Sequence, residues 1–107
     1  MGKVKTQQVI KALQKLKDKL GGVYKIDKML LFGSRARGSE LLTSDVDLMV
    51  ISSDFKGIRF IDRPDAFLQK WKLPVDLEIF CYSPEEFNRK KKQICIVQEA
   101  LKYGKEI

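Results

Sequence analysis

The segment that decides the fold runs from Met29 to Ile51 and reads MLLFGSRARGSELLTSDVDLMVI. Two apolar runs flank a turn that begins with Gly33 and Ser34, and the second run opens with Asp45-Val46-Asp47. If this second run is a strand, alternation places both aspartates on one face, with their Cα atoms roughly 6–7 Å apart. Two carboxylates at this separation can share divalent cations, because a two-metal phosphoryl-transfer site holds its ions about 3.5–4 Å apart.

The turn upstream of these aspartates has the composition of a phosphate-binding loop. A glycine where a strand ends lets backbone amides approach a phosphate closely, and Ser34 adds a hydroxyl donor. Arg35 and Arg37 supply positive charge beside Gly33 and Ser34. We therefore expect a phosphate site and a metal site on adjacent strands, which is the arrangement that a nucleoside triphosphate with bound magnesium requires.

This segment resembles the nucleotidyltransferase superfamily that includes DNA polymerase beta, and most closely its minimal nucleotidyltransferase branch. The signature of the family is Gly-Ser, ten residues, and Asp-x-Asp, and here Gly33-Ser34 is followed by residues 35–44 and Asp45-Val46-Asp47. The family carries a third carboxylate on a later apolar strand, and Asp76 in the run PVDLEIF takes that place. The resemblance covers nearly the whole chain.

The resemblance implies the polymerase-beta-like nucleotidyltransferase fold, a small α+β domain, and a Mg²⁺-dependent reaction. The enzyme would transfer a nucleotidyl group from an NTP to a hydroxyl and release pyrophosphate. ATP is the expected NTP, so the transferred group would be AMP. The implied ligands of two Mg²⁺ ions, which are also the catalytic residues, are Asp45, Asp47 and Asp76; the implied phosphate-binding residues are Gly33, Ser34 and Arg37. Glu78 stands where relatives carry an apolar residue, and its role is left open, as is that of Arg35.

The minimal branch also implies a partner protein, because its members accompany a helical HEPN-type toxin with ribonuclease activity. The chain would be the antitoxin and would transfer AMP to a tyrosine of the toxin. Two alternatives stay open at this point. The chain could adenylate a nucleic-acid end or a small molecule, or it could be a non-catalytic module that neutralises its partner by occlusion. A homodimer is neither required nor excluded.

Length and composition narrow the classes of chemistry. The 107 residues are expected to form one domain, residues 1–107. The chain has no histidine, which excludes a Ser-His-Asp triad and any imidazole-based metal site. Its two cysteines, Cys81 and Cys95, are expected to be free thiols. No apolar run approaches the roughly 20 residues that span a bilayer, so we expect no membrane partner and a cytoplasmic protein.

The formal net charge of +7 suggests an anionic partner. Six lysines lie in the first twenty residues, and Arg89–Lys92 form a second basic run. Either run could follow a nucleic-acid backbone, but neither is interleaved with aromatic residues, so a solvated helix face is the preferred interpretation. Trp71 is expected to pack on the core rather than to stack on a base.

The periodicity of apolar residues predicts a small α/β sandwich, with a mixed sheet covered by helices on one face. A helix capped by Thr6 and ended by Gly21-Gly22 carries an apolar stripe of Val9, Leu13, Leu16 and Leu20. The run Ser83-Pro84-Glu85-Glu86 has the pattern of a capping box. The remaining expected elements are strands at Lys28–Phe32, Val46–Ile51 and Val75–Cys81, a loop from Ser52 to Phe60, and helices at Ala66–Lys72 and Gln93–Tyr103.

Overall fold

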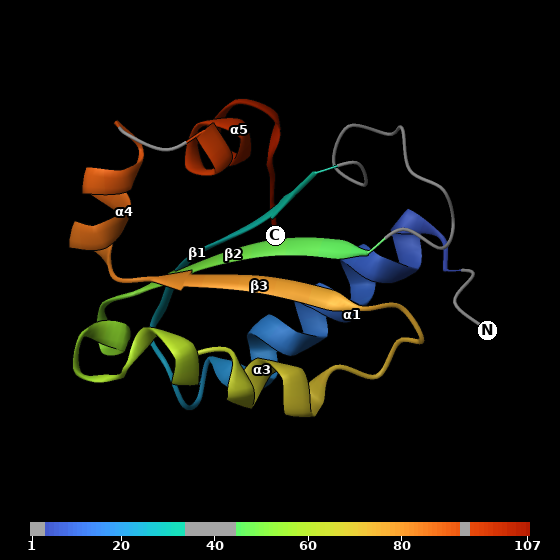
Figure 1. The fold of residues 1–107 in the computed structure, drawn as a ribbon. Helices are drawn as coiled ribbons and strands as arrows, with labels where there is room; N and C mark the ends of the chain where they lie inside the picture. The colour runs from blue at the N-terminus through green and yellow to red at the C-terminus, as the bar shows by residue number, and fades with distance from the viewer. Residues whose placement is uncertain (1–3, 34–44, 93–94) are drawn as a thin grey trace.

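The computed structural model describes residues 4–33, 45–92 and 95–107, which form one sheet with helices on both sides (Figure 1). The elements, in chain order, are α1 (Thr6–Leu20), β1 (Ile26–Phe32), β2 (Val46–Ser52), the 3-10 helices η1 (Ser53–Gly57) and η2 (Phe60–Asp62), α3 (Asp65–Lys70), β3 (Leu77–Tyr82), α4 (Pro84–Lys90), α5 (Cys95–Tyr103) and β4 (Lys105–Glu106). None of the helices within these described ranges is long and apolar enough to cross a membrane.

The sheet has the strand order β3-β2-β1-β4 and is mixed, as the sequence predicted. Strand β1 pairs antiparallel with β2 and β4, whereas β2 and β3 are parallel. The register places Phe32 of β1 opposite Asp47, and Asp47 opposite Glu78 of β3. The short edge strand β4 was not predicted, because two residues carry no periodic signal.

Helices cover both faces of the sheet, so the expectation of one covered face was wrong (Figure 1). Helices α1 and α3 pack on one face, where Leu13 and Phe67 are fully buried. Helices α4 and α5 cover the other, where Phe87 and Val97 meet Met49. The physical reason for two covered faces lies in the strands. Strands β1 and β2 are apolar at consecutive positions, which indicates burial on both faces.

Helix α1 forms where the apolar stripe predicted it, and all four residues of the stripe are buried. Its first residue is Thr6, however, and the N-cap is Lys5, whose backbone N–H donates to Oε1 of Gln8 at 2.9 Å. The helix ends at the glycine pair, as predicted, with Gly21 as the C-cap. A shift of one residue at a helix end leaves the buried face unchanged.

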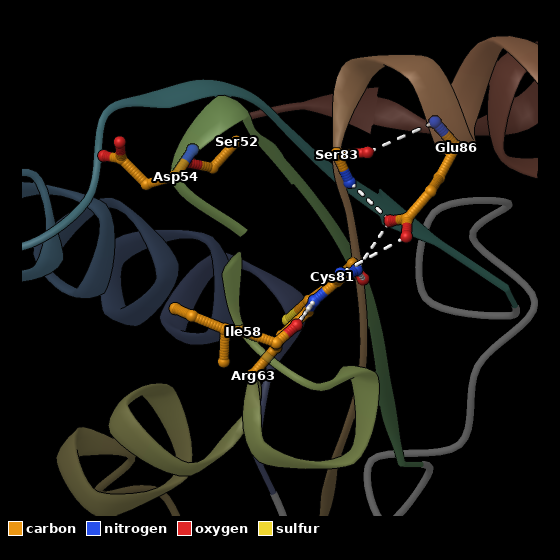
Figure 2. Close-up of polar contacts among 7 residues, drawn as sticks. All are labelled: Ser52, Asp54, Ile58, Arg63, Cys81, Ser83 and Glu86. Atoms are coloured by element: carbon orange, nitrogen blue, oxygen red, sulfur yellow. Dashed lines mark hydrogen bonds and ion pairs between the residues drawn. The ribbon is translucent and has the colours of Figure 1, made fainter. Parts of the chain in front are cut away.

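A buried arginine links the segment before α3 to the other side of the sheet (Figure 2). The side chain of Arg63 is only 5% exposed, and its guanidinium contacts Glu86 at 2.6 Å. It also donates to the carbonyl oxygens of Ile58 at 2.9 Å and of Cys81 at 3.1 Å. Glu86 is also the N3 residue of the predicted capping box, and its carboxylate accepts from the backbone N–H of Ser83 at 2.8 Å. Hydrogen bonds from Arg63 lower the pKa of Glu86 to about 2.

Cys81 is a free, buried thiol on β3, as predicted. Burial raises its pKa to about 12, although the nearby charge of Arg63 acts in the opposite direction. The thiol is therefore protonated and unreactive at neutral pH. The side chain of Cys95 lies outside the described part of the structure.

Candidate active site

Gly33, directly after β1, packs on the second aspartate of the Asp-x-Asp motif. Gly33 adopts φ +76°, the left-handed region in which a side chain is strained. An ideal Cβ on Gly33 would overlap Oδ2 of Asp47. The antiparallel register explains this contact, because Phe32, the residue before the glycine, is the partner of Asp47. The structure thus joins two elements of the sequence signature that lie 14 residues apart.

Four carboxylates lie at the end of the sheet where β2 and β3 begin. Asp47 and Glu78 are direct partners in the parallel register, and the backbone N–H of Val46 donates to the carbonyl oxygen of Asp76 at 2.9 Å. Val46 points into the core under α1. By alternation, Asp45 and Asp47 therefore face the opposite side of the sheet, and so do Asp76 and Glu78.

These four side chains differ in their exposure to solvent. Asp45, Asp76 and Glu78 are exposed, whereas Asp47 is half-buried beside Gly33. The sequence predicted that strand β3 begins at Val75, but it begins at Leu77. Asp76 therefore immediately precedes the strand. The three exposed side chains are therefore accessible to a cation that approaches from solvent.

The structure describes only some of the residues that the sequence predicted for the site. Gly33 and Asp47 are in contact, and Asp45 and Asp76 precede neighbouring parallel strands. Ser34, Arg35 and Arg37 lie outside the described residues. Glu78, which the sequence left without a role, is the register partner of Asp47 and therefore a second candidate for the third carboxylate.

The donor chemistry of this site fits magnesium, which prefers carboxylate oxygens. Among the described residues, however, no group of three or more Asp, Glu, Cys or His side chains is arranged to hold a metal ion. Asp45, Asp47 and Asp76 are the residues that the sequence predicted as ligands. Their role as metal ligands thus stays a prediction that rests on side-chain chemistry and on a shared face and end of the sheet.

Residues 9–106 match a family model described as "Nucleotidyltransferase domain". This match spans most of the chain. The chain belongs to the nucleotidyltransferase-domain family. The Gly-Ser and Asp-x-Asp motifs, the site at the start of β2, and strand β3 all lie within the matched range.

Two known proteins are similar to this nucleotidyltransferase-family chain. A protein of Methanocaldococcus jannaschii with the name "putative protein adenylyltransferase" is 38% identical over 78 residues, which cover 72% of this chain and 80% of that protein. A crystal structure described as "a putative nucleotidyltransferase" from Sulfolobus solfataricus superposes with a TM-score of 0.64 at 23% identity. That match covers 79% of this chain and 76% of the other, and it supports the fold alone.

Proposed function

We propose that this nucleotidyltransferase is a Mg²⁺-dependent protein adenylyltransferase that transfers AMP from ATP to a hydroxyl of a partner protein. The contact between Gly33 and Asp47 carries the proposal, because it sets a glycine turn suited to phosphates directly against a carboxylate suited to a metal. The M. jannaschii relative supports a protein as acceptor, since its name describes a protein adenylyltransferase.

In the proposed reaction, the acceptor oxygen forms a bond to the α-phosphorus of ATP. The bond from the α-phosphorus to the oxygen that bridges to the β-phosphate breaks, and pyrophosphate leaves. Asp45 and Asp47 would hold the metal, and Asp76 would help to take the proton from the acceptor hydroxyl. Magnesium, when bound, would stabilise the charge that develops on the phosphates and acidify the hydroxyl. Gly33, with Ser34 and Arg37, would bind the β- and γ-phosphates.

We further propose a HEPN-type toxin as the partner, with a tyrosine as the acceptor. This proposal rests on the resemblance to the minimal nucleotidyltransferase branch, in which such a toxin is the companion of the enzyme. The carboxylates favour an enzyme over a purely occluding antitoxin, because a surface that acts only by binding has no need of four carboxylates on one face of the sheet.

Calorimetric titration of ATP, with and without Mg²⁺, tests the nucleotide site. Wild type should bind ATP in a magnesium-dependent manner, and Asp45→Asn/Asp47→Asn should not. Asp65→Asn, an exposed carboxylate in the first turn of α3, is the control and should bind like wild type. Magnesium-independent binding, or binding retained by the double variant, would contradict the proposed site.

The acceptor is tested by purifying the chain with its bound proteins, identifying any HEPN-type protein among them, and adding α-³²P-labelled ATP. Label should appear on the partner, and replacement of the acceptor tyrosine by phenylalanine should abolish it. Label on co-purified RNA instead would redirect the reaction to nucleic-acid ends. Full neutralisation of the toxin by Asp47→Asn would favour occlusion over catalysis.

A further inference from the structure

A basic groove lies between α1 and the segment that follows α3, on the face of the sheet opposite the carboxylates. Its volume is about 350 Å³. Figure 1 shows α1 and α3 side by side beneath the sheet. The groove takes its charge from α1 and from residues 70–72, and its residues are Gln8, Lys11, Ala12, Lys15, Leu16, Lys19, Lys70, Trp71, Lys72 and Leu73.

Five lysines surround the basic groove, and none of the described residues that line it is acidic. All five are exposed, and none forms an ion pair with another described residue. Lys11, Lys15 and Lys19 recur every four residues, so they follow one side of α1 at intervals of about 6 Å along its axis. Such a row of unpaired cations can contact successive phosphates of a single strand.

Trp71 supplies the aromatic group that the basic helix lacks in sequence. Its side chain packs against the core, as the sequence predicted, and the residue is half-buried. Its indole Nε1 donates to the carbonyl oxygen of Val75 at 2.7 Å, which fixes the orientation of the ring. Ala12, Leu16 and Leu73 add apolar surface beside it. A fixed aromatic ring on an apolar floor is a suitable platform for a nucleobase.

We propose that the basic groove binds single-stranded nucleic acid, with phosphates on the lysines and a base stacked on Trp71. The sequence favoured a solvated helix face because no aromatic residue interrupts the α1 lysines. The fold supplies that residue from a segment more than fifty positions away. An acidic peptide would satisfy the lysines but would not require an oriented indole, so the ring favours nucleic acid.

Fluorescence anisotropy with a labelled oligouridylate of about twelve nucleotides, without ATP or Mg²⁺, tests the charge of the groove. Replacement of Lys11, Lys15, Lys70 and Lys72 by Gln should weaken binding at least tenfold. It should also reduce the magnitude of the slope of log binding constant against log salt concentration by roughly 2–3. Each phosphate contact to a single strand contributes about 0.7 to that slope, and the variant removes four lysines. The control is a variant with the same change in charge, in which Gln replaces four exposed lysines outside the groove: Lys25, Lys91, Lys92 and Lys105. This variant should weaken binding by less than about threefold.

Equal losses in the two quadruple variants would overturn the proposal, because binding would then reflect net charge alone. The groove variant should still bind ATP with magnesium in calorimetry, since its lysines lie across the sheet from the carboxylates. A failure of ATP binding in wild type would count against the proposed enzyme and would leave the groove experiment unaffected, as that experiment uses neither ligand.

Trp71 is the only tryptophan of the chain, so its fluorescence reports directly on stacking. Oligouridylate should quench this fluorescence. Trp71→Leu should weaken binding roughly tenfold, and Trp71→Phe should retain most of the affinity because an aromatic face remains. Circular dichroism should show both variants folded. Absence of quenching, together with equal binding of polyglutamate, would assign the groove to an acidic protein segment and overturn the proposal.

Discussion

The backbone of Gly33 lies against the carboxylate of Asp47, so closely that a β-carbon on the glycine would overlap Oδ2. This contact connects the end of β1 with the start of β2 and defines the candidate site. Glycine is required there for two independent reasons, its φ of +76° and the close approach of the carboxylate. Any side chain at this position must displace the aspartate, the turn, or both.

Gly33→Ala should therefore abolish magnesium-dependent ATP binding and lower stability. The left-handed backbone alone costs about 1–2 kcal/mol for a residue with a side chain, and the overlap with Asp47 adds to this cost. Calorimetry and urea unfolding measure the two effects. Gly57→Ala is the matched control, because no atom lies within 4 Å of its added Cβ and its φ is not positive. Unchanged ATP binding by Gly33→Ala would show that the turn does not contribute to the nucleotide site.

The third carboxylate can be assigned by comparing Asp76→Asn with Glu78→Gln. The family signature favours Asp76, so its substitution should reduce AMP transfer on the order of 10²-fold, as for other groups that stabilise charge in the transition state. Glu78→Gln should reduce transfer by less than about tenfold. Initial rates of pyrophosphate release measure both. The reverse order would assign the role to Glu78, the register partner of Asp47.

The sequence predicted those features of the fold that depend on local patterns. The apolar stripe of α1 and the capping box of Ser83 and Glu86 were found from spacing, because helical periodicity and caps are local. The Gly-Ser and Asp-x-Asp motifs predicted a site, and the fold brings Gly33 and Asp47 into contact.

What the sequence missed depends on contacts between distant segments. The burial of Arg63 was not predicted, because its partner, Glu86, lies 23 residues further on and local patterns do not connect the two. The apolar runs of β1 and β2 indicated burial on both faces, but they did not reveal that helices α4 and α5, from the end of the chain, form the second cover. The sequence correctly predicted that Trp71 packs on the core. It did not predict that Trp71 lies beside the α1 lysines, because only the folded chain brings these segments together.

Loss of the Arg63 side chain should destabilise the fold strongly. Arg63→Ala leaves the carboxylate of Glu86 without its partner and leaves the carbonyl oxygens of Ile58 and Cys81 without their donor. Removing one partner of a buried ion pair costs about 3–5 kcal/mol, and urea unfolding should show a loss in that range. Arg59→Ala is the control, because the Arg59–Asp62 pair is exposed and such pairs contribute about 0–1 kcal/mol. Equal, small losses in both variants would show that the Arg63–Glu86 pair contributes little.

Acid should destabilise the protein through the same ion pair. The pKa of Glu86 falls from 4.5 to about 2 on folding, with Arg63 as the main cause, and the carboxylate side chain is 27% exposed. Because this pKa is lowered, the stabilisation is complete above about pH 4.5 and is lost as pH falls toward 2; by linkage it amounts to at most about 3 kcal/mol.

Urea unfolding of wild type and Glu86→Gln across this pH range isolates that contribution. Wild type should lose its advantage over the variant between about pH 4.5 and 2, whereas Glu85→Gln, which removes an exposed ion pair with Lys56, should differ little from wild type at any pH. A constant difference between wild type and Glu86→Gln down to about pH 2 would mean that Glu86 has the same pKa in the folded and unfolded chains, so that its charge does not stabilise the fold.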